Sequence, residues 1–429
     1  MHILRVTGAY RLRHWLAAAV MWALAVGAAS AAGPPQSTCV QCHSYAVRGA
    51  WLNMVPQWKS SIHAAEGVGC NDCHGGNPRA TDFKQAMYNV PGFTARWAKR
   101  DIPAMCARCH ANPVRMRPYS IPTDQYSQYQ QSVHGRRLLQ AGDDNVAACT
   151  DCHGVHAIRA PDDPESSVFK VNVPKLCAGC HANKQLMAQY GLPTGQYDQY
   201  VRSVHGRKLL QQGDRMAPAC PDCHGAHGAT PPGVTEVPAV CGRCHARTEQ
   251  EFNAGAHKVS LDASGKPRCV DCHGNHGIQL PRDAMLVGDA RGQCGSCHGP
   301  GTKARSVGER VHGLITRTAE KDAAAVRLVD AAAAAHMDVG DLRVELGKPY
   351  TSLLEARAAQ HAVAIAPVED TTRKAMKVLD NVEREARQAL ADSRRHRDIV
   401  LVLAGLFVLG SAILWLKRWQ VMAATFRGR

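Results

Sequence analysis

Residues 149–156 read CTDCHGVH, which places two cysteines and two histidines within eight positions. The centre of this stretch is C-x-x-C-H, and a further histidine, His156, follows three residues after His153. The C-x-x-C-H motif occurs nine times in the 429 residues and uses all 18 cysteines. Nine copies with no cysteine left over indicate one chemistry that is repeated along the chain.

That chemistry is the covalent attachment of haem c, for which C-x-x-C-H is the motif. Its two thiols add to the two vinyl groups of the porphyrin, and the adjacent histidine ligates the iron from one face. A disulfide scaffold needs no histidine after every second cysteine, and a zinc site pairs C-x-x-C units without a fixed histidine. We therefore predict nine haem c groups with their iron. The predicted thioether residues are Cys39, Cys42, Cys70, Cys73, Cys106, Cys109, Cys149, Cys152, Cys177, Cys180, Cys220, Cys223, Cys241, Cys244, Cys269, Cys272, Cys294 and Cys297. The predicted proximal ligands are His43, His74, His110, His153, His181, His224, His245, His273 and His298.

The chain also repeats on a longer scale, because residues 128–156 match residues 199–227 at an offset of 71 positions. Two kinds of haem motif alternate along it. One kind reads C-x-D-C-H-G and carries Asp72, Asp151, Asp222 or Asp271. Three of the plainer copies have a proline three residues before the first cysteine, at Pro103, Pro174 and Pro238.

Extra histidines recur at fixed places in these repeats and are the candidate distal ligands. A histidine three residues after C-x-D-C-H-G cannot reach the opposite face of its own haem, so we expect it to ligate a neighbouring haem. These residues are His156, His227 and His276, and the upstream candidates are His63, His134, His205, His257 and His312. The alternative is that some of them are ordinary surface histidines.

The first module is one histidine short, because Asn77 stands where later modules carry the extra histidine. The ninth distal ligand is then His361, His336 or a methionine such as Met54, or one iron is open. His361 is a candidate because Leu354, Ala358 and His361 share one face of an expected helix.

Two apolar runs suggest export and membrane attachment. Arg5, Arg11 and Arg13 precede the apolar run 15–28 and the small residues 29–31, so residues 1–32 are a predicted signal peptide, or alternatively an uncleaved anchor. Residues 399–416 are apolar and would form a helix of about 27 Å, close to the hydrocarbon thickness. We predict a transmembrane helix over 398–418 and a cytoplasmic tail over 419–429. A buried core helix is the alternative.

The remaining boundaries follow from composition. Only 6 Phe but 37 Gly and 23 Pro predict a mostly α-helical chain with extensive loops and a haem-filled core over residues 33–300. Residues 301–397 contain no cysteine, and the spacing of Met376, Leu379 and Val382 predicts an amphipathic helix. We expect a helical hairpin or spacer domain there, punctuated at Gly340 and Pro349.

The formal charge of +15 does not imply nucleic-acid binding. Each haem adds two propionates, so the basic excess mostly offsets cofactor charge. Export argues against nucleic acid as well.

The repeated C-x-x-C-H motifs, with S-V-H-G and C-x-D-C-H-G-x-H, resemble those of the multihaem cytochromes c of the cytochrome c3-like, doubled C-x-x-C-H kind. The resemblance covers residues 37–312 and departs in the first module. It implies a multihaem cytochrome c fold with closely spaced bis-histidine haems. It also implies electron transfer between the membrane quinone pool and periplasmic or extracellular acceptors in anaerobic respiration.

We therefore expect an electron carrier on the periplasmic face of the bacterial cytoplasmic membrane, without catalytic residues of its own. Its expected partners are a quinol-oxidising membrane subunit or the quinone pool, and periplasmic or outer-membrane redox proteins. The alternative is a reductase or oxidase of nitrite, hydroxylamine or tetrathionate at one open haem.

Overall fold

The computed structural model describes residues 37–45, 53–88, 90–233, 236–288 and 292–427. The predicted signal peptide lies outside these residues. No strand occurs among the described residues, which confirms the expected mostly α-helical chain with many loops. The chain divides into two compact units, residues 1–231 and 232–429. The boundary between the units falls inside the stretch predicted as one haem domain, and the last haem motifs belong to the same unit as the C-terminal helices.

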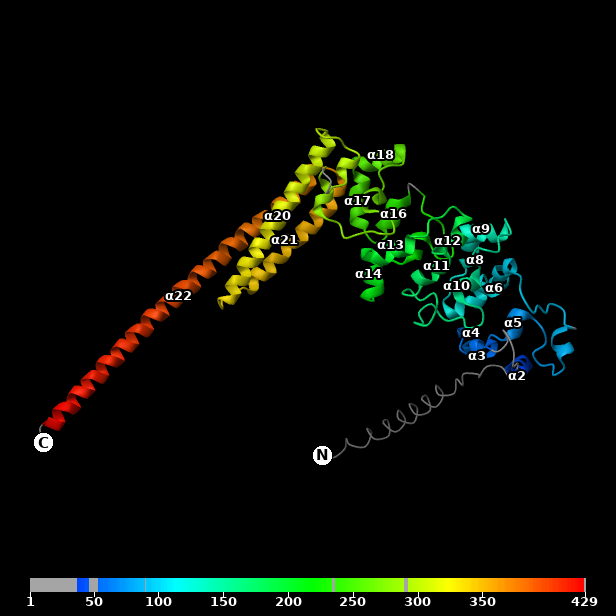
Figure 1. The fold of residues 1–429 in the computed structure, drawn as a ribbon, viewed down its shortest axis with the longest axis horizontal. Helices are drawn as coiled ribbons and strands as arrows, with labels where there is room; N and C mark the ends of the chain where they lie inside the picture. Colours follow the sequence, from blue (N-terminus) through cyan, green and yellow to red (C-terminus); the bar gives the residue numbers. More distant parts are fainter. Residues whose placement is uncertain (1–36, 46–52, 89, 234–235, 289–291, 428–429) are drawn as a thin grey trace, which may run out of the picture. The chain divides into compact units, whose positions relative to one another are not determined.

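The first unit consists of short helices joined by loops (Figure 1). In chain order they are α2 (Thr38–Ser44), α3 (Met54–Lys59), α4 (Ile62–Ala65), α5 (Cys70–His74), η2 (Lys84–Tyr88), η3 (Lys99–Asp101), α6 (Ile102–His110), α7 (Pro113–Met116), η4 (Arg117–Tyr119), α8 (Gln125–Gln131), α9 (Val133–Leu139), α10 (Cys149–His153), α11 (Val173–His181), α12 (Lys184–Ala188), α13 (Gln196–Arg202), α14 (Val204–Gln211) and α15 (Cys220–His224).

The sequence repeat is also a structural repeat. Leu138 is fully buried with Val146 and Ala148, and 71 positions later Leu209 is fully buried with Ala217 and Ala219. The Tyr129 hydroxyl donates to the Ala147 carbonyl at 2.9 Å, and the Tyr200 hydroxyl donates to the Pro218 carbonyl at 2.8 Å. These apolar clusters are small, so the polypeptide alone supplies little core in this unit.

Each C-x-D-C-H-G motif forms one short helix whose ends explain the signature. In α10 the Asp151 carboxylate accepts a hydrogen bond from the Ala148 backbone N–H at 2.7 Å, which satisfies a donor at the helix start. Gly154 ends the helix with φ of +80°, a conformation that favours glycine. The equivalent aspartates and glycines in α5, α15 and α19 (Cys269–His273) do the same: Asp72, Asp222 and Asp271, then Gly75, Gly225 and Gly274.

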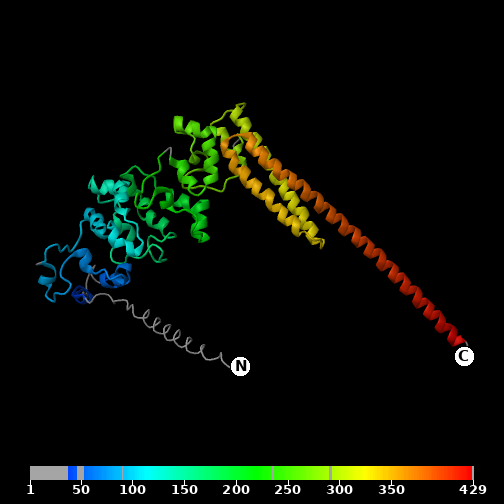
Figure 2. The same ribbon diagram turned by 180° about the vertical axis from the view of Figure 1, so that it is seen from behind.

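The second unit joins three haem motifs to three long helices (Figures 1 and 2). Its elements are α16 (Val237–Gly242), α17 (Ala246–Ala254), α18 (Ala256–Ser264), α19 (Cys269–His273), η6 (Asp283–Leu286), η7 (Cys294–Ser296), α20 (Lys303–Ala334), α21 (Gly340–Ala359), η8 (Gln360–Ala362) and α22 (Ile365–Arg427). Helices α20 and α21 lie along the first half of α22 in both views.

The buried residues of the long helices recur at alternating steps of three and four, the pattern of helices that pack along their length. On α22 these residues are Val368, Thr372, Ala375, Leu379, Val382 and Ala386. Val368 packs in one cluster with Val311 and Leu353, and Leu379, Val382 and Ala386 pack in the other with Val329 and Leu342 of α20 and α21. We call this three-helix arrangement the helix bundle.

Two features of this bundle differ from the sequence expectation. Gly340 begins α21, but Pro349 lies inside it and is buried, so the helix continues where a break was expected. The helical turns before and after Pro349 pack against the bundle, and this packing keeps the helix continuous although proline lacks a backbone N–H donor. Helix α22 runs without a break from the bundle through the apolar run, so that the predicted transmembrane segment continues the bundle helix.

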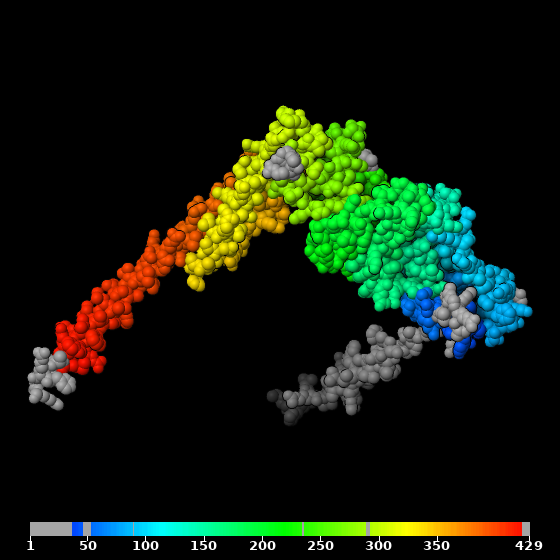
Figure 3. All heavy atoms as spheres, viewed as in Figure 1, coloured from blue at the N-terminus to red at the C-terminus, as the bar shows by residue number. Residues whose placement is uncertain are grey.

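By length and composition, α22 is the one described helix that is suited to crossing a membrane. Every residue from Arg394 to Met422 is exposed, and the red end of α22 stands clear of the other helices in Figure 3. A buried core helix, the alternative, would show covered side chains there.

Candidate haem sites

In the ring contacts of the described residues, six histidines of the haem motifs face a second histidine at nearly the same spacing. The distances between ring centroids lie between 6.0 and 6.4 Å. The pairs are His110 with His63, His74 with His156, His181 with His134, His153 with His227, His298 with His257, and His273 with His361. In every pair the second histidine is one of the distal candidates.

This spacing suits one metal ion between two imidazoles. With metal–nitrogen bonds of roughly 2.0–2.1 Å on both sides, the two ring centroids stand about 6 Å apart. The angles between the ring planes range from 4° for His153 and His227 to 61° for His63 and His110, so ring stacking is not what the pairs share. The described residues therefore fit six-coordinate haem iron at these six places.

The imidazoles are held in the form that binds a metal. Burial is the main cause that lowers the pKa of ten of them, because it disfavours the charged ring. They are His63, His110, His134, His153, His156, His181, His227, His257, His273 and His361.

Backbone carbonyls orient two of the paired histidine rings. His74 Nδ1 lies 2.7 Å from the Thr94 carbonyl, and His361 Nδ1 lies 3.1 Å from the Ala358 carbonyl. A carbonyl only accepts, so Nδ1 carries the proton in both rings and the lone pair of Nε2 is left for a metal.

The pairing follows two rules across the repeats. The upstream His63 and His134 face the plain motif of their own module, at His110 and His181. The extra histidines face the C-x-D-C-H-G motif of the preceding module, as His156 does at His74. The first module therefore receives its missing histidine from the second.

The structure places the other candidates differently. His361 occupies the distal place opposite His273, the position that the second rule gives to an extra histidine of a following module. His312 lies on α20, where its Nε2 is 3.3 Å from the Thr316 hydroxyl within the same helix. His205 repeats the S-V-H-G setting of His134, and His276 repeats the motif position of His156. The remaining alternatives are Met54, which is partly buried at the start of α3, and His336, which is exposed with φ of +59°.

The S-V-H-G segment sets the direction of the upstream histidine. Ser132 caps α9 and accepts a hydrogen bond from the Gly135 backbone N–H at 2.9 Å, with His134 between them. A Cβ at Gly135 would stand 1.8 Å from the Tyr129 carbonyl oxygen, so only glycine fits. The same contacts recur at Ser203 and Gly206 around His205.

Ion pairs that sequence reasoning missed connect neighbouring motifs. Lys99 Nζ lies 3.0 Å from Asp151, and Lys170 Nζ lies 3.2 Å from Asp222. Each lysine precedes a plain motif, and each aspartate caps the helix of the C-x-D-C-H-G motif that follows it. Both pairs obey the 71-residue offset, which is the signal that would have identified them.

Neighbouring motifs meet at their cysteines. A hydrogen bond between the thiols of Cys106 and Cys149 raises the pKa of Cys106, and one between Cys177 and Cys220 raises the pKa of Cys177. A hydrogen bond with Cys269 lowers the pKa of Cys241 to about 7. Burial followed by nearby Cys39 raises the pKa of Cys70. In all four pairs the first cysteines of consecutive motifs are neighbours.

Between these junctions, consecutive motifs are related through their second cysteines. Burial, Asp72 and then Cys109 raise the pKa of Cys73. Cys180 contributes in the same way at Cys152, and Cys294 and Cys297 at Cys272. Haem attachment turns these thiols into thioethers. The sulfur atoms would then keep their positions in the haem-loaded protein, although the thiol protons are lost. The motifs thus follow one another in chain order within each unit.

Comparison with known proteins gives two family matches. Residues 62–182 match the family described as cytochrome c3, and residues 213–250 match the doubled CXXCH motif. Each match covers less than half of the chain.

Two curated relatives are C-type polyheme cytochromes of Geobacter sulfurreducens. One is OmcC, 25% identical over 177 residues, which are 36% of this chain and 21% of OmcC. The other is OmcB, 32% identical over 120 residues, which are 27% of this chain and 13% of OmcB. The chain thus matches only a small part of the length of either relative. The matches and the motifs together support a multihaem c-type cytochrome with covalently bound haem c.

Proposed function

We propose that this chain is a nine-haem electron carrier, anchored on the periplasmic face of the cytoplasmic membrane by the apolar part of α22. Haem c supplies reversible one-electron oxidation and reduction of its iron. The residues of this chain hold the haems, ligate their iron and set their order. The observation that carries the proposal is the set of six imidazole pairs, because iron ligated by an imidazole on each face would have no coordination position left for a substrate.

The cysteine contacts explain how electrons would move along the chain. Tunnelling falls exponentially with distance, so transfer requires haem edges close together. Cys106 and Cys149 hydrogen-bond to each other, and each would carry a thioether at the edge of its own haem. Hydrogen bonds between cysteines, or their electrostatic influence on one another, relate consecutive motifs from Cys39 to Cys220 in the first unit, and from Cys241 to Cys297 in the second.

The proposed ligands extend the observed pairs by the same rules. His205 and His276 serve as distal ligands, since they repeat the positions of His134 and His156. The proposed partners are a quinol-oxidising subunit or the quinone pool on one side and periplasmic or outer-membrane redox proteins on the other. Anaerobic respiration is the setting that such partners imply.

Mass spectrometry and electron paramagnetic resonance of the purified ferric protein test this function. We expect the mass of nine haems, a reduced spectrum of low-spin haem c and low-spin ferric signals from the haems with two assigned histidines. Fewer haems would reject the nine-haem count. A high-spin component that binds nitrite or hydroxylamine would instead favour a reductase at an open haem.

A further inference from the structure

The haem-bearing end of the second unit and its apolar span lie at opposite ends of the helix bundle. His298 lies five residues before α20, and His361 lies four residues before α22. The two helices run in the same direction, because Val311 packs with Val368 and Lys321 pairs with Asp380 at 2.6 Å further along. Both histidines therefore lie at the starting end of the bundle.

The haem sites are fastened to that end. His361 faces His273, and Arg357 on α21 forms a bidentate ion pair with Asp283, with distances of 3.0 and 2.8 Å. Gly255 touches the backbone of Ala362, where a Cβ would stand 2.8 Å from the carbonyl oxygen. These contacts fix the haem motif of Cys269 and Cys272 directly against the bundle.

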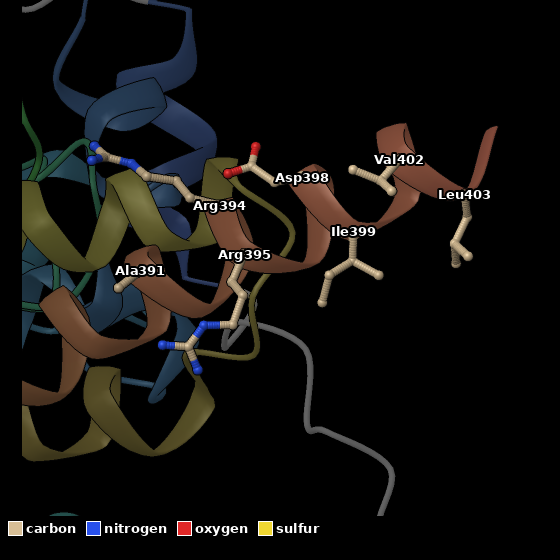
Figure 4. Close-up of a pocket in the computed structure, with 7 residues that line it drawn as sticks. All are labelled: Ala391, Arg394, Arg395, Asp398, Ile399, Val402 and Leu403. Atoms are coloured by element: carbon tan, nitrogen blue, oxygen red, sulfur yellow. The ribbon is translucent and has the colours of Figure 1, made fainter. Parts of the chain in front are cut away.

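The apolar span starts where the bundle ends. The Ser393 hydroxyl donates to the Ala335 carbonyl in the turn after α20 at 3.1 Å. One turn later, charged and aliphatic side chains meet around a shallow pocket, lined by Ala391, Arg394, Arg395, Asp398, Ile399, Val402 and Leu403 (Figure 4). This change from charged to aliphatic side chains marks the level expected for the membrane surface.

The distance between the two ends follows from the helix rise. From Ile365 to Ile399, α22 is one unbroken helix, so at 1.5 Å per residue the two points are about 50 Å apart along its axis. Helices α20 and α21 pack along most of this length, which stiffens it. Direct tunnelling over such a gap is negligible.

We propose, on the basis of the function proposed above, that the bundle is a stalk that keeps the haems of this unit out of reach of quinones in the bilayer. The partner that exchanges electrons with them is a redox protein whose own redox group stands at the far end of the stalk. One electron passes at each encounter: the reduced partner is oxidised and a ferric iron of this unit becomes ferrous.

Liposomes that contain the full-length holoprotein test the stalk. Two one-electron donors with the same viologen head are compared, one soluble in water and one with an alkyl tail that confines it to the bilayer. We expect the soluble donor to reduce the haems in a fast phase that is absent with the tailed donor. In detergent the tailed donor should regain the fast phase, which shows that it is competent.

Equal fast phases for the two donors in liposomes would overturn the stalk. Failure of the soluble donor would count against the electron-carrier function, so the two ideas fail separately. Electron microscopy of the holoprotein in lipid nanodiscs gives a second readout that involves no electron transfer. We expect the haem of Cys294 and Cys297 at the far end of the bundle, and an iron at the level of the lipid headgroups would refute the proposal.

Discussion

His273 and His361 face each other with ring centroids 6.2 Å apart, although only His273 belongs to a haem motif. His361 lies in η8, between the second and third helices of the bundle. We therefore predict that the helical segment contributes a ligand to a haem site, and that its fold and the haem of Cys269 and Cys272 depend on each other.

Replacing His361 tests this dependence. His361→Ala removes the imidazole opposite His273, so we expect one of the haems to become high-spin in the ferric protein while the number of attached haems is unchanged. His312→Ala is the matched control, because His312 lies on α20 with its Nε2 at Thr316 and faces no motif histidine in the described pairs. Electron paramagnetic resonance distinguishes the two variants. A high-spin signal in the His312 variant alone would contradict the assignment.

The pairing of His156 with His74 predicts an effect outside the mutated motif. His156→Met should place a thioether sulfur on the iron of the Cys70–Cys73 haem and raise its reduction potential, since methionine ligation favours the ferrous state. A redox titration measures the shifted component, and an electron-density map of the holoprotein locates the sulfur. Loss of the ligand from the haem of Cys149 and Cys152 would show that the histidine serves its own motif.

The sequence predicted which residues form these sites, but it did not predict which motif each extra histidine faces. The C-x-x-C-H count and the repeated histidines follow from local spacing, and in the described pairs the structure brings five of those histidines, and His361, to motif histidines. Which motif each histidine faces depends on how modules pack, and no spacing within one module contains that information. His156 illustrates this, because its partner His74 lies in the preceding module.

The helical segment shows a similar limit. Pro349 was expected to interrupt a helix, because local rules weigh the missing backbone donor. In the bundle it is buried between turns that pack on both sides, and tertiary contacts outweigh the local cost. The continuation of α22 into the apolar run likewise joins two segments that composition had separated.

Glycine in the S-V-H-G segment has a steric role that can be measured. Gly135→Ala forces a Cβ against the Tyr129 carbonyl, and such overpacking typically costs about 1–3 kcal/mol. We expect a lower melting temperature and a disturbed haem of Cys177 and Cys180, because His134 is the next residue. Gly347→Ala is the control, since that glycine of α21 lies outside the haem motifs and has no neighbour within 4 Å of the added Cβ. Equal stability of both variants would show that the S-V-H-G glycine is replaceable.

A partly buried carboxylate in the bundle predicts a pH-dependent stability. Asp322 sits between Thr318 and Ala325 in the buried stripe of α20, and its Oδ1 is buried without a hydrogen-bond partner in the described structure. Burial raises the pKa of Asp322, because the charged form is poorly solvated there. The bundle is therefore less stable when Asp322 is ionised.

Replacement with a neutral isostere measures that penalty. An acid whose pKa is raised on folding destabilises the folded state above its folded pKa, and the penalty disappears as the pH falls towards the ordinary aspartate value of about 3.9. Asp322→Asn should therefore melt at a higher temperature than the parent at pH 7 to 8, with the difference shrinking as the pH approaches that value. Asp330→Asn on the same helix is the control, because Asp330 is exposed and its ion pair with Arg343, at 3.6 Å, adds little stability. Circular dichroism of the holoprotein follows the melting. A difference between Asp322→Asn and the parent that stays constant with pH would mean that packing, and not ionisation, sets the cost of this residue.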